Sequence, residues 1–73
     1  MNAVATVNAS GLSCPQPVIL TRQALRDHPH GEIVVLVDSA TSRDNVRRLA
    51  EREGCSVVIE EAPSGGFRLL LSR

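Results

Sequence analysis

A single cysteine within a proline-rich run is the residue of this chain best suited to chemistry. Cys14 lies in the run Gly11-Leu12-Ser13-Cys14-Pro15-Gln16-Pro17, which is followed directly by an apolar-periodic stretch. Prolines just before such a stretch are typical of the first helical turn, where a missing N–H group is tolerated. The spacing therefore predicts that Cys14 lies at or next to a helix N-cap. A sulfur there meets the positive end of the helix dipole, where thiolates are stabilised and reactive cysteines are often found.

The same prolines restrict which amides can face the sulfur. Pro15 and Pro17 have no N–H group, so the Gln16 amide is the main first-turn donor if Cys14 is the N-cap, and the Val18 amide comes next. A free thiol has a pKa of about 8.5, so only a few per cent of it is ionised at neutral pH. Even a modest stabilisation of the anion would raise the thiolate share several-fold. The motif is thus typical of a nucleophilic sulfur.

The second cysteine, Cys55, carries a different expectation. It lies between Gly54 and an apolar stretch, which favours a small buried side chain over a reactive one. In the order of elements given below, the two cysteines lie at opposite ends of the sheet. A helix of about 12 residues spans about 18 Å, which exceeds the reach of a disulfide. We therefore expect no intramolecular bridge.

Length and charge limit the classes of function. The 73 residues correspond to one domain, residues 1–73, with a thin core and little room for an enclosed pocket. Chemistry at a helix end or a loop on the surface suits a carrier or adaptor better than a self-contained enzyme. The formal net charge is zero, which makes direct nucleic-acid binding an unfavoured function, because such binding needs a basic face.

Several other classes of protein lack support in the sequence. No apolar run approaches the roughly 20 residues that span a bilayer, and the N-terminus lacks the pattern of a signal peptide, so we expect a cytoplasmic protein. No serine-histidine-acid set, glycine-rich phosphate loop or zinc-ligand spacing is present. We expect neither a metal nor a bound cofactor.

Hydrophobic periodicity predicts the elements that must position the cysteine. An edge strand over 3–8 leads to a helix over 15–28, and a continuously apolar central strand follows over 32–37. A second helix, capped by Thr41 or Ser42 with Asp44 or Asn45 as box-like partner, runs to Glu53 and ends at a left-handed Gly54. Strands over 56–61 and 67–72 form a hairpin around 63–66. The order βαβαββ predicts an α/β two-layer sandwich, a mixed four-stranded sheet with two helices on one face.

Two sets of surface residues bear on partners. Arg22 and Arg26 follow Cys14 on the first helix and are candidates for partner docking. The second helix buries Val46, Leu49 and Ala50, and its outer side carries four arginines interleaved with acids, in which Asp44 and Arg48 have the favourable spacing of four. An ion-paired, solvated face is favoured there over a docking patch; the arginines are Arg43, Arg47, Arg48 and Arg52. The sequence leaves open which face of the sheet the helices cover and whether the open face pairs with another chain. The apolar side chains that this open face could show are Val34, Leu36 and Leu70.

The cysteine run closely resembles the motif of the TusA/SirA/YedF family of small sulfur-carrier proteins. The Gly-Leu pair before Cys-Pro-x-Pro, the amphipathic helix after it, the element order and the chain length all match, so the resemblance covers nearly the whole chain. TusA-type sequences tend to carry a paired acidic motif after the central strand. This chain has Val37-Asp38-Ser39 there and a segment over 44–48 that is closer to the YedF type.

The resemblance implies that Cys14 accepts sulfane sulfur as a persulfide and passes it to another protein's thiol. The motif residues that would support the cysteine are Gly11, Leu12, Pro15, Gln16 and Pro17. A cysteine desulfurase or other sulfur-donor protein and a downstream thiol acceptor protein are the implied partners. Pyridoxal phosphate would belong to the donor, so the chain itself needs no cofactor. Family members serve tRNA thiolation, molybdenum-cofactor supply, sulfur oxidation or selenium metabolism.

Two other classes of function stay open beside the carrier. A regulatory or protein-interaction module would use a helix face to bind its partner and would tolerate Cys14→Ser. An RNA-binding domain would show steeply salt-dependent RNA affinity, against which the zero net charge counts. The proposed fold is similar to the C-terminal domain of a translation initiation factor, but fold analogy alone does not establish function. A selenium-handling role is a variant of the carrier, with selenium on the same thiol.

Overall fold

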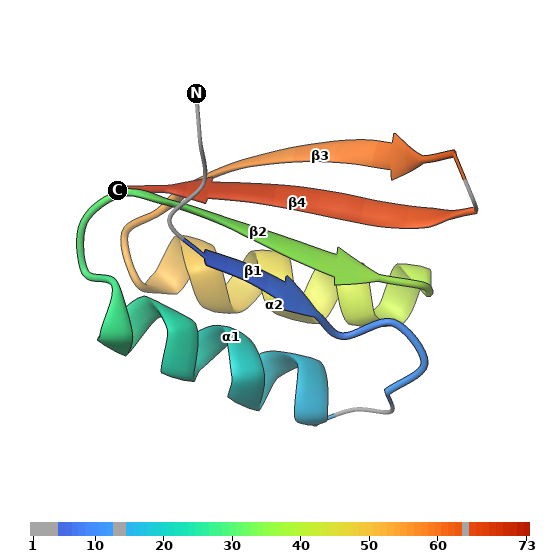
Figure 1. Ribbon diagram of the computed structural model, residues 1–73, viewed down its shortest axis with the longest axis horizontal. Coiled ribbons are helices and arrows are strands. Elements are labelled where there is room, and N and C mark those ends of the chain that lie inside the picture. The colour runs from blue at the N-terminus through green and yellow to red at the C-terminus, as the bar shows by residue number, and fades with distance from the viewer. Residues whose placement is uncertain (1–4, 13–14, 64) are drawn as a thin grey trace.

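Two helices and four strands follow one another in the predicted order. The computed structural model describes residues 5–12, 15–63 and 65–73 (Figure 1). The elements are β1 (Ala5–Asn8), α1 (Gln16–Asp27), β2 (Glu32–Val37), α2 (Ala40–Arg52), β3 (Ser56–Ala62) and β4 (Gly66–Ser72). The predicted helix over 15–28 differs from α1 by one residue at each end, and the predicted central strand coincides with β2.

The sheet is mixed and its strands lie in the order β1-β2-β4-β3. β1 pairs with β2 in parallel, whereas β4 is antiparallel to both of its neighbours, β2 and β3. The continuously apolar β2 is central and the short β1 lies at an edge, as predicted. β4 can begin beside the end of β2 only because Gly66 has no side chain, since a Cβ atom there would lie 2.5 Å from the carbonyl oxygen of Val37.

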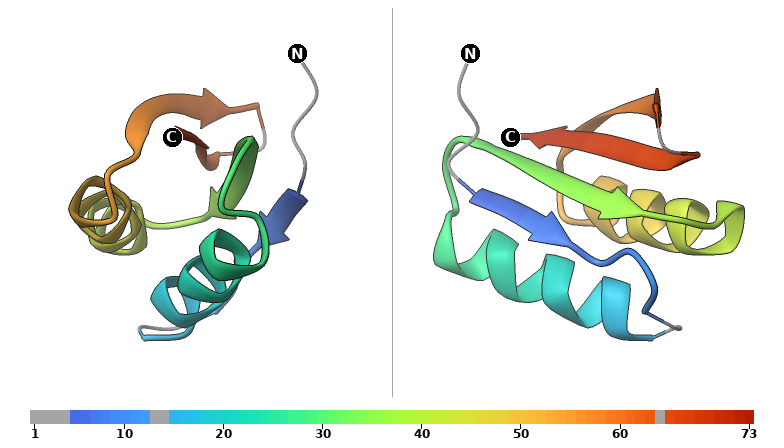
Figure 2. Two further views of the ribbon diagram at one scale, coloured as in Figure 1. Left: turned by 90° about the vertical axis from the view of Figure 1, so that its left-hand side faces the viewer. Right: turned by 45° about the vertical axis from the view of Figure 1, so that its right-hand side comes forward.

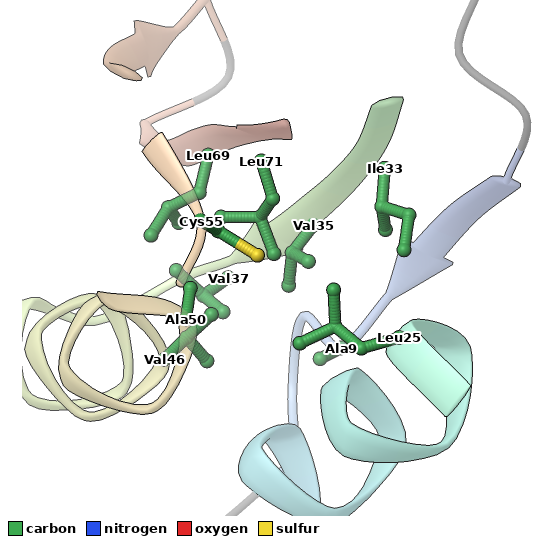
Figure 3. Close-up of a cluster of buried hydrophobic side chains, with 10 residues drawn as sticks. All are labelled: Ala9, Leu25, Ile33, Val35, Val37, Val46, Ala50, Cys55, Leu69 and Leu71. Atoms are coloured by element: carbon green, nitrogen blue, oxygen red, sulfur yellow. The ribbon is translucent and has the colours of Figure 1, made fainter. Parts of the chain in front are cut away.

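Both helices cover the same face of the sheet, which confirms the two-layer architecture (Figure 2). The strand residues on this face are fully buried: Ile33, Val35 and Val37 from β2, and Leu69 and Leu71 from β4. Leu25 from α1 and Val46 and Ala50 from α2 pack against them (Figure 3). The alternation of buried and half-buried residues along β2 follows from the two-residue period of a strand.

No helix of the described residues lies over the opposite face of the sheet. Val34, Leu36 and Leu70 are half-buried there, and Val58 on β3 is 56% exposed. Val34 lies opposite Leu70, which in turn lies opposite Val58. Arg68 and Glu60 form an ion pair of 2.8 Å on the neighbouring row. The structure thus places the three residues named from the sequence on the uncovered face.

The start of α2 differs from the prediction. The N-cap is Ser39, whose extended backbone lets its Oγ accept a hydrogen bond of 3.1 Å from the Ser42 N–H group. Thr41 and Ser42, predicted as caps, lie inside the first turn, so Asp44 and Asn45 are too far along the helix to complete a capping box. The prediction was wrong because the earlier Ser39 caps the helix, which therefore begins at Ala40.

The end of α2 is the predicted left-handed stop. Gly54 has φ of 86°, and its N–H group donates to the Glu51 carbonyl oxygen at 3.1 Å. The N–H group of Cys55 donates to the Ala50 carbonyl oxygen at 2.9 Å, which completes a Schellman motif. This turn directs the chain into β3. Neither helix, within the part of the chain that is described, has the length and apolar character that a membrane span needs.

Candidate functional site

The residues around Cys14 form the start of α1. Ser13 and Cys14 lie outside the described residues, but the residues on either side of them are described. Pro15 is the N-cap, and its carbonyl oxygen accepts the first helical hydrogen bond from Ile19 N–H at 3.0 Å. In sequence, Cys14 therefore comes one residue before the cap, consistent with a position at or next to it. The first-turn amides left to serve an anion belong to Gln16 and Val18, because Pro15 and Pro17 have none.

Long-range hydrogen bonds hold the turn that precedes the cysteine. The Gly11 N–H group donates to Asp38 Oδ2 at 2.7 Å, across 27 residues of sequence. Ala9 N–H donates to the Leu36 carbonyl oxygen at 2.8 Å, and Leu12 N–H donates to the Ala9 carbonyl oxygen at 3.2 Å. Gly11 has φ of 81°, a backbone conformation that favours glycine. The turn is thus tied to the carboxyl end of β2.

Asp38 is a residue of this site that the sequence analysis did not assign to it. The sequence held part of the information that places Asp38 near Gly11, because the carboxyl ends of two parallel neighbouring strands meet at the same edge of a sheet. Once β1 and β2 are paired, the residue after β2 must lie near the turn after β1. The pairing itself was the missing information.

The motif residues divide into anchors and exposed positions. Pro17 is buried, Leu12 is half-buried against the core, and Gly11, Pro15 and Gln16 are exposed. The buried Thr21 hydroxyl donates to the Pro17 carbonyl oxygen at 2.7 Å, one turn back along α1. The inward residues fix the start of the helix while the outward residues leave it accessible.

The two candidate docking arginines have different surroundings. Arg22 lies in a groove between α1 and α2, whereas Arg26 is exposed in the last turn of α1 and is not part of the groove. The groove has a volume of about 290 Å³ and is lined by Pro15, Val18, Arg22, Asn45, Arg48, Leu49 and Arg52. Arg48 and Arg52 are therefore site candidates that the sequence analysis had assigned to an ion-paired face.

The ion pairs of α2 correct that assignment. Asp44 pairs with its neighbour Arg43 at 3.0 Å, and the structure shows no Asp44–Arg48 pair among the described residues. Arg47 pairs with Glu51 at 3.3 Å, with the expected spacing of four. The outer face is thus ion-paired as expected at two of its four arginines. The other two face the groove.

Arg43, near the start of α2, interacts with two other side chains. Its guanidinium lies 4.6 Å from the centre of the Phe67 ring, in a cation–π contact with β4. Its hydrogen bond to Asp44 lowers the pKa of that carboxyl below its usual value, and the positive charges of Arg47 and Arg48 act in the same direction. Asp44 therefore stays ionised to more acidic pH than an isolated aspartate.

Cys55 lies in the core rather than at the site. It is 8% exposed and is a free thiol. Figure 3 shows its side chain directed into the cluster between α2 and the sheet. The position agrees with the core role expected from the sequence. Within residues 5–12, 15–63 and 65–73, the side chains of His, Cys, Asp and Glu nowhere gather in a group of three that could hold a metal ion.

Comparisons with known proteins extend over nearly the whole chain. The family model described as sulfurtransferase TusA matches residues 5–73. A Methanocaldococcus jannaschii protein named as a sulfur carrier is 32% identical over 72 residues, which cover 97% of this chain and 96% of that protein. The sulfur carrier protein TusA of Pseudomonas savastanoi pv. phaseolicola is 37% identical over 65 residues, 86% of this chain and 76% of that protein.

The fold has a solved counterpart. The crystal structure of the SirA-like protein from Desulfitobacterium hafniense matches this structure with a TM-score of 0.88 at 32% sequence identity. The match covers 94% of this chain and 96% of the other. The two helices on one face of a mixed four-stranded sheet are thus shared with a SirA-like protein.

Proposed function

The chain belongs to the TusA family of sulfurtransferases, and we propose that it carries sulfane sulfur as a persulfide on Cys14 between two proteins. The partners in this proposal are a sulfur-donor protein, such as a cysteine desulfurase, and a downstream protein with an acceptor thiol. Both would belong to the cytoplasm, where thiols stay reduced. The chain would then transfer sulfur between two other proteins rather than act as a self-contained enzyme.

The loading step is a thiol–persulfide exchange. The Cys14 thiolate attacks the terminal sulfur of the donor's cysteine persulfide, and a new sulfur–sulfur bond forms on Cys14. The donor's own sulfur–sulfur bond breaks, and its electron pair leaves with the donor cysteine as a thiolate. No external oxidant or reductant is needed, because the sulfane sulfur moves at constant oxidation state. Exchange of this kind depends on the thiolate fraction and on access to the sulfur.

One observation carries the proposal. The residues that flank Cys14 form a fixed, outward-facing helix start, with Gly11 tied to Asp38 and Pro17 buried below. Gln16 and Val18 supply the first-turn amides, whose partial positive charge favours an anion. Such a frame supports a reactive thiolate without an enclosed pocket. The exposure of Pro15 and Gln16 favours the approach of a partner's cysteine.

Intact mass spectrometry tests the loading of Cys14. The purified protein is incubated with a cysteine desulfurase and L-cysteine, beside the variants Cys14→Ser and Cys55→Ala. We expect a gain of one sulfur atom that reductant removes, that Cys14→Ser abolishes and that Cys55→Ala retains. Cys55→Ala is the matched control because it removes the only other thiol. A failure to load Cys14 with several different donors would instead favour the protein-interaction module.

The subgroup and the pathway are further parts of the proposal. Asp38 directly after β2 and the segment over 44–48 favour the YedF type over the TusA type. The acceptor is then sought beyond tRNA thiolation, among cofactor synthesis, sulfur oxidation and selenium handling. Selenium transfer would use the same thiol. Incubating loaded protein with candidate acceptors and following the mass of both partners would identify the pathway.

A further inference from the structure

The groove between α1 and α2 has an apolar floor and a basic rim. The described apolar residues that line it are Pro15, Val18 and Leu49, and its charged residues are Arg22, Arg48 and Arg52. All three arginines are exposed, and none of the described residues that line the groove carries a carboxylate. Figure 2 shows the two helices on the same face of the sheet, and the residues that line the groove come from the start of α1 and from both helices.

The nearby carboxylates are already paired with other arginines. Asp44 pairs with Arg43, Glu51 with Arg47, and Glu53 with Arg73 at 3.7 Å. In the described parts of the chain, no ion pair is formed by the three arginines of the groove. The protein as a whole is neutral, yet this groove holds three positive charges of its own. Arg48 also acts on the nearby Asp44 carboxylate, but an anionic partner would meet three arginines that form no ion pair among the described residues.

The spacing of the arginines fits the carboxylates of a peptide. Arg48 and Arg52 are four residues apart on α2, which separates them by about 6 Å along the axis. Acidic residues four apart on a helix, or two apart on an extended strand, have nearly the same spacing. The apolar floor between the helices offers burial to an adjacent aliphatic side chain.

Nucleic acid fits the groove less well. Single-stranded nucleic acid is bound by aromatic side chains on which bases stack, together with a groove that follows the backbone. The only aromatic residue of the chain is Phe67, which lies on β4 against Arg43 and does not line the groove. The apolar floor and the neutral overall charge also favour a protein partner.

From these observations we infer that the groove binds an acidic segment of a partner protein, in which two carboxylates flank an aliphatic side chain. The inference rests on the proposed function for its biological meaning. Pro15 lines the groove and follows Cys14 directly in sequence. A donor or acceptor protein bound in the groove would therefore lie next to the start of α1, which follows Cys14 in sequence. Charge complementarity of this kind gives specificity and speeds encounter.

The test uses a defined peptide and the full chain. A capped peptide that repeats Glu-Leu-Ala-Glu three times is titrated into isotope-labelled protein, beside a peptide with Gln at every Glu. We expect the acidic peptide to shift the side-chain Nε–H signals of Arg22, Arg48 and Arg52. Replacing all three by Gln should weaken binding about tenfold, because exposed ion pairs each contribute modestly. Arg47→Gln, which removes a paired arginine of the same helix, should leave binding unchanged.

Three results would overturn the inference. These are equal binding of both peptides, an equal loss in the Arg47→Gln control, or tighter binding of a ten-residue oligouridylate to the same arginines. Loading of Cys14 by inorganic polysulfide, which needs no docking protein, separates this inference from the proposed function. Peptide binding without loading would reject the carrier and keep the groove. Loading without peptide binding would reject the groove and keep the carrier.

Discussion

The Asp38 carboxylate connects the end of β2 to the turn before Cys14. It accepts a hydrogen bond from the Gly11 N–H group at 2.7 Å, and this is a contact between residues far apart in sequence. A charged acceptor strengthens such a bond, although its exposure to water weakens it. Since Gly11 has a left-handed backbone, the turn benefits from an external anchor. We therefore regard Asp38 as a positioning residue for the motif.

Removing that anchor should loosen the turn without unfolding the protein. For Asp38→Ala we expect amide hydrogen exchange at Gly11 to quicken by about fivefold, the equivalent of about 1 kcal/mol for one exposed hydrogen bond. Asp38→Asn keeps a side-chain oxygen and should restore most of the protection. Asp27→Ala, at the exposed end of α1, is the control and should leave Gly11 unaffected. Unchanged exchange in Asp38→Ala would show that the bond does not hold the turn.

At this scale the sequence predicts local chemistry well and distant contacts poorly. The helix start at the prolines and the buried position of Cys55 follow from neighbours in sequence, and the structure has both. The Asp38–Gly11 bond depends on the pairing of β1 with β2, which no local pattern states. Cys14 remains assigned by its motif and its family rather than by observed geometry.

Among the elements, α2 shows how caps and charges compete. Gly54 was predictable because a left-handed stop needs a residue without Cβ strain. The N-cap of α2 was not predictable, because three hydroxyl residues lie close together in sequence and only the backbone geometry selects Ser39. The charge pattern was equally ambiguous, since Asp44 could pair with Arg48 one turn away or with Arg43 beside it. The structure has the Arg43 pair, and this leaves Arg48 at the groove.

The pairing of Asp44 predicts a specific dependence on pH. Its hydrogen bond with Arg43 lowers the pKa of the folded state, so the stability it contributes is present above the unfolded-state pKa. That contribution is lost as the pH falls through the lowered folded-state pKa. In Arg43→Gln the titration midpoint of the Asp44 carboxyl, followed by NMR, should move upward toward its usual value. Arg26→Gln, on α1, should not move it, and a fixed midpoint in Arg43→Gln would contradict the assigned cause.

For the whole molecule, the topology gathers the site at one end. The carboxyl ends of β1 and β2 and the starts of α1 and α2 lie together there (Figure 1). The element order and the apolar patterns predicted the two-layer fold. The meeting of these ends depends on the pairing of β1 with β2, which the patterns left open. How α1 and α2 pack against each other was not predictable, since it depends on side chains of both. The groove and its three arginines therefore emerge only from the structure.

The division of the sheet into a core face and an open face leads to the last prediction. Leu69 and Leu70 are neighbours on β4, but Leu69 is fully buried beneath the helices and Leu70 is half-buried on the open face. Leu69→Ala should lower the free energy of unfolding by about 2–5 kcal/mol, because it leaves a cavity in a thin core. Leu70→Ala should cost roughly 1 kcal/mol, because water already reaches that face.

Urea unfolding followed by far-ultraviolet circular dichroism measures both variants, since the chain contains neither tryptophan nor tyrosine. The two losses of unfolding free energy can be compared if both variants keep the m value, the slope of that free energy against urea concentration. A small domain has a total stability of about 5–15 kcal/mol, so Leu69→Ala removes a large share of it. Equal losses in the two variants would mean that the open face is covered in solution, either by a second copy or by a rearranged helix. A large loss in Leu69→Ala alone would mean that the open face is uncovered in solution. The groove in the helix layer would then be the docking surface that the structure supports.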